Sequence, residues 1–267
     1  MPWKDMSAII LQDEIVHYEV LGRGRPLLFL HGWVGSWRYR IPTMQAASIS
    51  FRTYALDLWG FGDTAKNSSL YPLDLQVQML DAFMEKMGIG KIALVGHGLG
   101  AVVSMMYAAR YPKFVDRVMA IGMPTENSSI NPRMRTDSPS ELADWLLGRT
   151  PVTEAARVEA PKADPRAIVA TIEDTSRLQL GELSNSIVPP CLFVYGQDDT
   201  AIQMTNADQL SSLPDQTHYI VFEQSGHFPM LDEGSKFNRL MTDFLSLKSG
   251  ESPRQLQLKE EWKRRVR

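Results

Sequence analysis

The chain has 267 residues, of which 44% are hydrophobic and 22% are charged, as in an ordinary globular protein. Its formal net charge of -3 gives no general attraction to nucleic acid or to an anionic membrane. No apolar run reaches the ~20 residues of a membrane-spanning helix, and we expect no secretory signal at Met1 to Asp5. The single cysteine, Cys191, excludes an intrachain disulfide framework and favours a cytoplasmic location.

Short apolar runs and amphipathic helical patterns alternate along most of the chain. The apolar runs predict strands at 15–20, 27–30, 52–58, 91–95, 117–121, 190–195 and 217–222. Helices are expected at 73–87, from 102 to about 110, and at 237–247, where apolar residues recur every three or four positions. This alternation predicts an α/β fold whose mostly parallel sheet is covered by helices on both faces.

The alternation stops between Met123 and Val188. This stretch contains several prolines and short helical patterns at 141–147 and 167–175. Because a structureless loop of that length is improbable in a compact domain, we expect an inserted helical cap. The expected divisions are a core formed by 1–124 and 189–248, a cap at 125–188, and a C-terminal tail at 249–267. A ligand is expected between the cap and the carboxyl ends of the strands.

The tail has the pattern of a short amphipathic helix. Leu258, Trp262 and Val266 lie four residues apart, with basic residues between them. Such a helix could dock on the domain, on a partner or on an acidic surface. We favour a tail that is surrounded by solvent.

Five glycine-containing stretches follow expected strands, and together they resemble the motifs of the α/β-hydrolase fold family. They are His31-Gly32-Trp33, Asp57-Leu58-Trp59-Gly60-Phe61-Gly62, Gly96-His97-Gly98-Leu99-Gly100, Gly196-Gln197-Asp198-Asp199 and Gly226-His227-Phe228-Pro229. The resemblance extends from about Ile15 to Leu247. It implies an α/β-hydrolase fold with a cap, acting on a small, fairly apolar, ester-like carbonyl compound without a metal or an organic cofactor.

The third stretch departs from the family pattern at the residue that carries the chemistry. A nucleophile elbow has the sequence Gly-x-Ser-x-Gly, and here the middle residue is Gly98. Glycine supplies no nucleophilic atom, but it adopts freely the positive φ of an elbow, which costs other residues about 1–3 kcal/mol. We also expect the missing hydroxymethyl group to leave space for about one water molecule.

The resemblance assigns the remaining site residues. His227 takes the place of the catalytic base, and Asp199 that of the acid which orients it. Asp198 and Glu126 are alternatives for the acid. The backbone amides of Trp33 and Leu99 take the place of the oxyanion hole, which does not depend on side-chain identity.

No other side chain is a convincing replacement for the missing nucleophile. His97 neighbours the elbow residue but is not aimed into the pocket. Cys191 is expected to be buried, and Ser104 to face the packing of its helix. Ser225 precedes the histidine turn but has no elbow to hold it. Asp57 is expected to be a structural acid at a strand end.

Several other side chains have two open interpretations. Six side chains could equally line an apolar pocket or belong to the ordinary core: Trp33, Trp37, Tyr39, Trp59, Met123 and Trp145. Arg38 and Arg40 either meet an acidic substrate or, as we favour, are surface charges of a helix.

The sequence therefore predicts a serine hydrolase inactivated by Gly98, with a small-molecule ligand as its partner. Two other functions remain open. His227 and Asp199 can act without a covalent step, by activating water or by abstracting a substrate proton. Alternatively, the protein is a non-catalytic binder that uses the capped pocket as a receptor.

Overall fold

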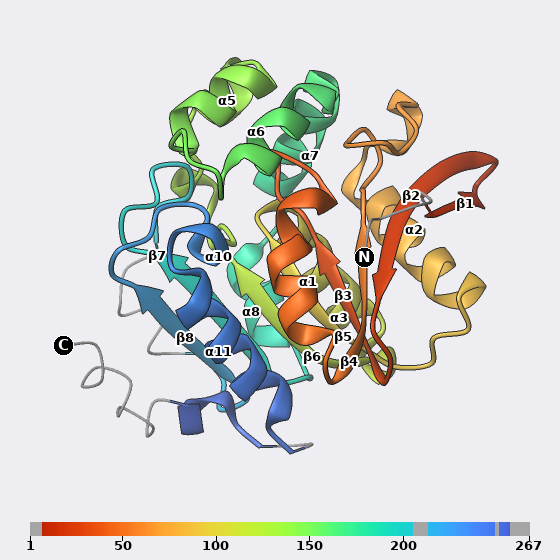
Figure 1. The fold of residues 1–267 in the computed structure, drawn as a ribbon, viewed down its shortest axis with the longest axis vertical. Helices are drawn as coiled ribbons and strands as arrows, with labels where there is room; N and C mark the ends of the chain where they lie inside the picture. The colour runs from red at the N-terminus through yellow and green to blue at the C-terminus, as the bar shows by residue number, and fades with distance from the viewer. Residues whose placement is uncertain (1–6, 205–212, 249–250, 257–267) are drawn as a thin grey trace.

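The computed structural model describes residues 7–204, 213–248 and 251–256, so Leu258, Trp262 and Val266 lie outside the described residues. The described chain forms one sheet in the order β1-β2-β4-β3-β5-β6-β7-β8 (Figure 1). Strands β3 to β8 are parallel to one another, β2 pairs antiparallel with β4, and β1 pairs antiparallel with β2 at the edge of the sheet. Their bounds are β1 Ser7–Leu11, β2 Glu14–Leu21, β3 Arg25–Leu30, β4 Phe51–Leu56, β5 Ile92–His97, β6 Val115–Ile121, β7 Cys191–Gly196 and β8 Thr217–Phe222.

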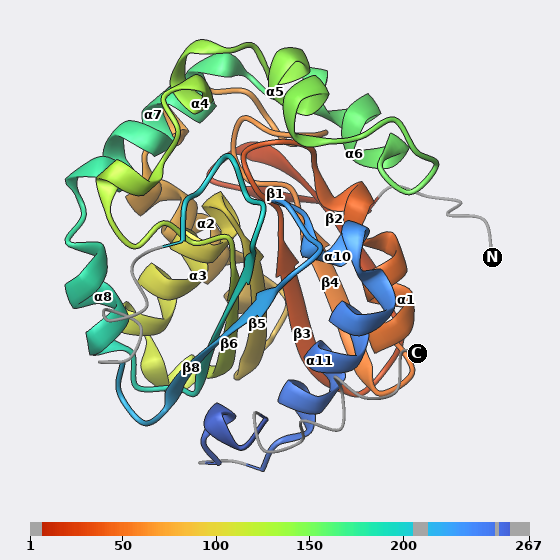
Figure 2. The ribbon, with the colours of Figure 1, turned by 90° about the vertical axis from the view of Figure 1, so that its left-hand side faces the viewer.

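Helices cover both faces of the sheet, as the sequence predicts. Figure 2 shows α1 (Ile41–Ala47), α10 (Pro229–Asp232) and α11 (Gly234–Ser246) on one side. The other side carries α2 (Leu73–Lys86), α3 (Leu99–Arg110) and α8 (Leu180–Ser186). The interior strands β5 and β7 are buried along their whole length, which explains their continuous apolar sequence.

Four helices between β6 and β7 cross one end of the sheet. They are α4 (Arg133–Thr136), α5 (Pro139–Leu146), α6 (Glu154–Glu159) and α7 (Pro165–Arg177), and they lie across the top of Figure 2. The indole Nε1 of Trp33, after the carboxyl end of β3, donates a hydrogen bond to Thr171 of α7. These helices therefore cover the carboxyl ends of the strands. Within the described part of the chain, no helix is both long and apolar enough to span a bilayer.

Candidate active site

Gly98 has the backbone conformation of an elbow between β5 and α3. Its φ is 49° and its ψ is -111°, which confirms the predicted positive φ. The Gly98 amide donates to the Ile121 carbonyl at 2.8 Å, and the Gly100 amide donates to the His31 carbonyl at 3.0 Å. A side chain at Gly96 would collide with the backbone of Gly100. The flanking glycines thus let the strand and the helix approach closely enough to form the sharp turn.

His227 and Asp199 form the expected pair. Nδ1 of His227 lies 2.8 Å from Oδ2 of Asp199, and the other oxygen of Asp199 accepts the Ala201 amide at 2.8 Å. Asp199, rather than Asp198 or Glu126, therefore orients the imidazole. Nε2 of His227 is buried and has no hydrogen-bond partner among the described residues. One nitrogen of the buried imidazole is thus unused.

The predicted oxyanion groups lie on two adjacent turns. A Cβ placed on Gly98 would lie 3.4 Å from Cα of Gly32, so the turn after β3 touches the elbow. The Leu99 amide is the first of α3, where helical N–H groups have no partner in their own helix. Within the described chain, the amides of Trp33 and Leu99 donate no hydrogen bond to the protein. Neither amide is thus occupied by a partner within this part of the protein.

A buried hydrogen-bond chain connects the three turns of the site. The Gly32 amide donates to Oη of Tyr39 at 2.8 Å, and Oη lies 2.9 Å from Nδ1 of His97. Nε2 of His97 donates to the His227 carbonyl at 2.8 Å. Burial, and then the neighbouring His227, hold the pKa of His97 well below its usual value, so the ring is neutral. Nδ1 consequently accepts the Tyr39 hydroxyl proton, and His97 is a structural link that has no free nitrogen.

The indole of Trp33 lies beside the position of the missing side chain. A Cβ on Gly98 would lie 3.1 Å and 3.3 Å from two carbons of the indole ring. The ring therefore takes up part of the space in which a water was expected. Among the other side chains that were expected in a pocket or in the core, Trp145 is partly buried. The remaining ones are buried, namely Trp37, Tyr39, Trp59 and Met123.

No described side chain replaces the missing nucleophile. The Cys191 thiol is fully buried, and burial raises its pKa. The hydroxyl of Ser104 donates to a backbone carbonyl of its own helix at 2.7 Å. The hydroxyl of Ser225 donates to Glu233 at 2.8 Å. Both hydroxyls are therefore engaged in hydrogen bonds, and burial disfavours the reactive thiolate of Cys191.

Asp57 organises the turn after β4. Its Oδ1 accepts the Trp37 amide at 2.9 Å, and its Oδ2 accepts the Asp63 amide at 3.1 Å. Nδ1 of His17 lies 3.0 Å from the same Oδ2, and Nε2 lies 3.3 Å from Glu19. Asp57 is completely buried, so these bonds compensate for the loss of its hydration. They agree with the structural role expected for Asp57.

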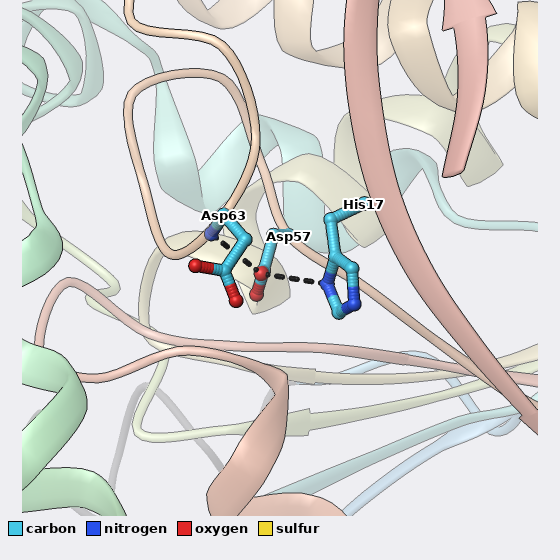
Figure 3. A group of neighbouring side chains, drawn as sticks. All are labelled: His17, Asp57 and Asp63. Atoms are coloured by element: carbon cyan, nitrogen blue, oxygen red, sulfur yellow. Dashed lines mark hydrogen bonds and ion pairs between the residues drawn. The ribbon is translucent and has the colours of Figure 1, made fainter. Parts of the chain in front are cut away.

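His17, Asp57 and Asp63 are residue types that bind metal ions, and their ligand atoms lie within 4.8 Å of one another (Figure 3). Hydrogen bonds already use both nitrogens of His17 and the facing oxygen of Asp57. Lys162 also pairs with Asp63 at 3.0 Å. We therefore interpret the group as a cluster of ionic hydrogen bonds.

Arg40 corrects the expectation of surface charges. Its side chain is fully buried, donates to the Leu30 carbonyl at 3.1 Å and lies 5.1 Å over the Tyr39 ring. Burial lowers the pKa of its guanidinium. Arg38, in contrast, is partly exposed and pairs with Glu159 of the cap at 2.9 Å. The surface interpretation was thus wrong for Arg40, because its position behind the oxyanion turn depends on tertiary packing.

The fold and the site define a protein of the α/β-hydrolase class, and comparison with known families agrees. Residues 25–166 match the family model of the alpha/beta hydrolase fold. The chain belongs to this family.

Curated relatives and a solved structure resemble the chain over most of its length. It is 23% identical over 255 residues to the 2-hydroxy-6-oxo-6-(2'-aminophenyl)hexa-2,4-dienoic acid hydrolase of Metapseudomonas resinovorans, covering 86% of this chain and 87% of that one. It is also 23% identical to the pimeloyl-[acyl-carrier protein] methyl ester esterase of Vibrio cholerae, covering 86% and 97%. A hydrolase structure from Pseudomonas aeruginosa superposes with a TM-score of 0.81 at 15% identity, covering 92% and 100%.

Proposed function

We propose that this protein binds a small, fairly apolar, ester-like carbonyl compound beneath its cap and does not hydrolyse it through an acyl-enzyme. The observation that carries the proposal is a glycine in elbow conformation, Gly98, in the same site as an oriented His227–Asp199 pair. The site thus has the groups that surround a serine nucleophile and lacks the nucleophile.

The available groups suit a carbonyl ligand. The amides of Trp33 and Leu99 would donate to the carbonyl oxygen, and they stabilise it most when negative charge develops there. His227 would accept a proton at Nε2 while Asp199 holds Nδ1. The curated relatives include a dienoate hydrolase and a methyl ester esterase, which supports a carbonyl compound as the ligand class.

The absence of a nucleophile has a large kinetic consequence. Removal of the serine of a catalytic triad lowers kcat by about 10⁶-fold in a well-studied protease. This factor corresponds to ~8 kcal/mol of transition-state stabilisation. Ordinary serine hydrolysis is therefore not the working function of a chain with Gly98.

A second candidate function is non-covalent catalysis by His227. The observation that favours it is the unpartnered Nε2, since a protein that only binds a ligand has no need of an oriented base. The imidazole would activate a water molecule or abstract a proton beside the substrate carbonyl. The Trp33 ring restricts the space for water beside Gly98, so proton abstraction is the better of the two reactions.

The decisive experiment restores the nucleophile. Gly98→Ser should react covalently with a fluorophosphonate and hydrolyse a short activated ester, while the parent does neither. Gly98→Ala is the matched control, because it adds the same Cβ and backbone strain without a hydroxyl. His227→Ala added to Gly98→Ser should abolish both labelling and turnover.

The outcomes separate the candidates. A parent that turns over the ester, and loses this activity with His227→Ala, would favour non-covalent catalysis over our proposal. A folded Gly98→Ser variant that binds carbonyl compounds but is inert to every probe would indicate a receptor whose site has diverged beyond the missing hydroxyl.

A further inference from the structure

The site is enclosed in this structure. The side chains of His227 and Asp199 are 1% and 2% exposed, and Trp33 is completely buried. A surface hollow lies elsewhere, at the amino ends of the strands, and its lining includes Phe51, Lys91 and none of the site residues. A ligand therefore reaches His227 only after a group that covers the site has moved.

Backbone closes two sides of the site. A Cβ on Gly122, just after β6, would lie 3.3 Å from Cε1 of His227, and a Cβ on Gly98 would lie 3.4 Å from Cα of Gly32. Neither backbone segment can withdraw without disrupting a strand end. The Trp33 indole, in contrast, is a side chain that rotates about its own χ angles, and it covers Gly98 from a third side.

The cap holds this indole in place. Nε1 of Trp33 donates to Oγ1 of Thr171 on α7 at 3.0 Å. The Thr171 hydroxyl donates its own proton to the Ala167 carbonyl at 2.7 Å, so its oxygen faces the indole as an acceptor. Thr171 is completely buried, and loss of the indole N–H would leave that oxygen with one partner fewer. One hydrogen bond thus connects the cover of the site to the cap.

We propose that Trp33 and Thr171 determine which ligands reach the site, with the indole as the cover over Gly98 and Thr171 as its latch. The inference deepens the proposed function, on which it rests for the nature of the ligand. The group flanking the ligand carbonyl occupies the space that the indole vacates. Small or flat groups are therefore admitted first, and a smaller residue at 33 admits bulkier ones.

The test measures access to Gly98 without requiring catalysis. Gly98→Cys places a thiol under the indole, and the only native cysteine, Cys191, is completely buried. Alkylation is followed with iodoacetamide and with the bulkier N-ethylmaleimide. Thr171→Val added to Gly98→Cys should accelerate alkylation by both reagents roughly two- to tenfold. This is the range expected from the loss of one hydrogen bond. Adding Trp33→Ala should accelerate the bulkier reagent most.

Thr175→Val is the matched control. Thr175 is equally buried on α7, and its hydroxyl donates to the Thr171 carbonyl rather than to the indole. It should leave both alkylation rates unchanged. Equal acceleration by Thr171→Val and Thr175→Val would indicate general loosening of the helix and would overturn the proposal, as would no acceleration by Thr171→Val.

A second measurement uses the native elbow and remains decisive if Gly98→Cys does not fold. The indole N–H of Trp33, assigned by its disappearance in Trp33→Phe, should exchange slowly with solvent in NMR spectra. Thr171→Val should accelerate this exchange and Thr175→Val should not. Fast exchange in the parent would contradict a latched cover, whatever the outcome of the hydrolase test.

Discussion

Gly98 and Gly88 both have positive φ, but they differ in what surrounds them. Gly98, with φ of 49°, faces the Trp33 ring, whereas a Cβ placed on Gly88, with φ of 66°, would meet nothing within 4 Å. Gly88→Ala should lower the free energy of unfolding by about 1–2 kcal/mol through backbone strain alone. Gly98→Ala should lower it further, because the Trp33 ring must also move. Urea denaturation measures both losses.

A double-mutant cycle isolates the contribution of the indole. Trp33→Phe provides a shorter ring, so the combination Gly98→Ala/Trp33→Phe should be less destabilised than the sum of the two single changes. Gly88→Ala combined with Trp33→Phe should be additive. Additivity in both pairs would mean that the indole does not resist a side chain at the elbow.

A second set of contacts, besides the Trp33–Thr171 hydrogen bond, connects the cap to the segment that follows the oxyanion turn. Glu159, at the end of α6, accepts the Ser36 hydroxyl at 2.9 Å and pairs with Lys162 at 3.0 Å. It also forms the ion pair with Arg38 described above. Its side chain is only 4% exposed, so these partners compensate for a buried charge.

Glu159→Gln should therefore loosen the cap before the sheet unfolds. Removing the charge leaves Arg38 and Lys162 less well compensated, at a cost of about 1–3 kcal/mol. Amide hydrogen exchange should increase in α6 and α7 and remain unchanged in β5. Arg177→Gln is the control, because the largely exposed Arg177 pairs with Glu173 and Asp174 of its own helix α7. Uniform acceleration that includes β5 would refute a local role for Glu159.

The sequence predicted the elements with the strongest apolar patterns, which are strands buried on both faces and a helix buried along one face. The apolar runs became β3, β5 and β7, and the helical repeat at 73–87 became α2. The strand β1 was missed, because exposed and partly buried residues alternate over most of its five residues. Helix α1 was also missed, since its seven residues include Pro42 and offer too few apolar repeats for a helical signal.

For the site, too, the sequence predicted what a local pattern encodes and missed what depends on tertiary packing. The family resemblance selected Gly98, Asp199 and His227 by their order and motif spacing, and each follows a strand at the same end of the sheet. The contact between Trp33 and Gly98 and the burial of Arg40 depend on how distant turns pack, and no local pattern encodes them. The sequence thus placed the turns that form the site but not the packing that encloses it.

The stability of the whole molecule should depend on the charge of His17. Burial lowers the pKa of His17, but the hydrogen bond and charge of Asp57, together with Glu19, raise it overall. The folded state therefore binds this proton more tightly than the unfolded chain. The resulting stability is fully present below the unfolded pKa of 6.5 and is lost as pH rises through the folded pKa, at about 1.4 kcal/mol for each pKa unit.

Other buried histidines act in the opposite direction and in a lower pH range. Burial lowers the pKa values of His31, His97 and His218, so their contributions to stability increase as pH rises towards 6.5 and are constant above it. As pH rises above 6.5, the melting temperature of the parent should consequently fall because of His17. His17→Gln should be less stable at pH 7 and should remove this fall, whereas His218→Gln should retain it. A parent melting temperature that is constant over this range, or a fall that persists in His17→Gln, would show that the Asp57 and Glu19 carboxylates do not hold the His17 proton.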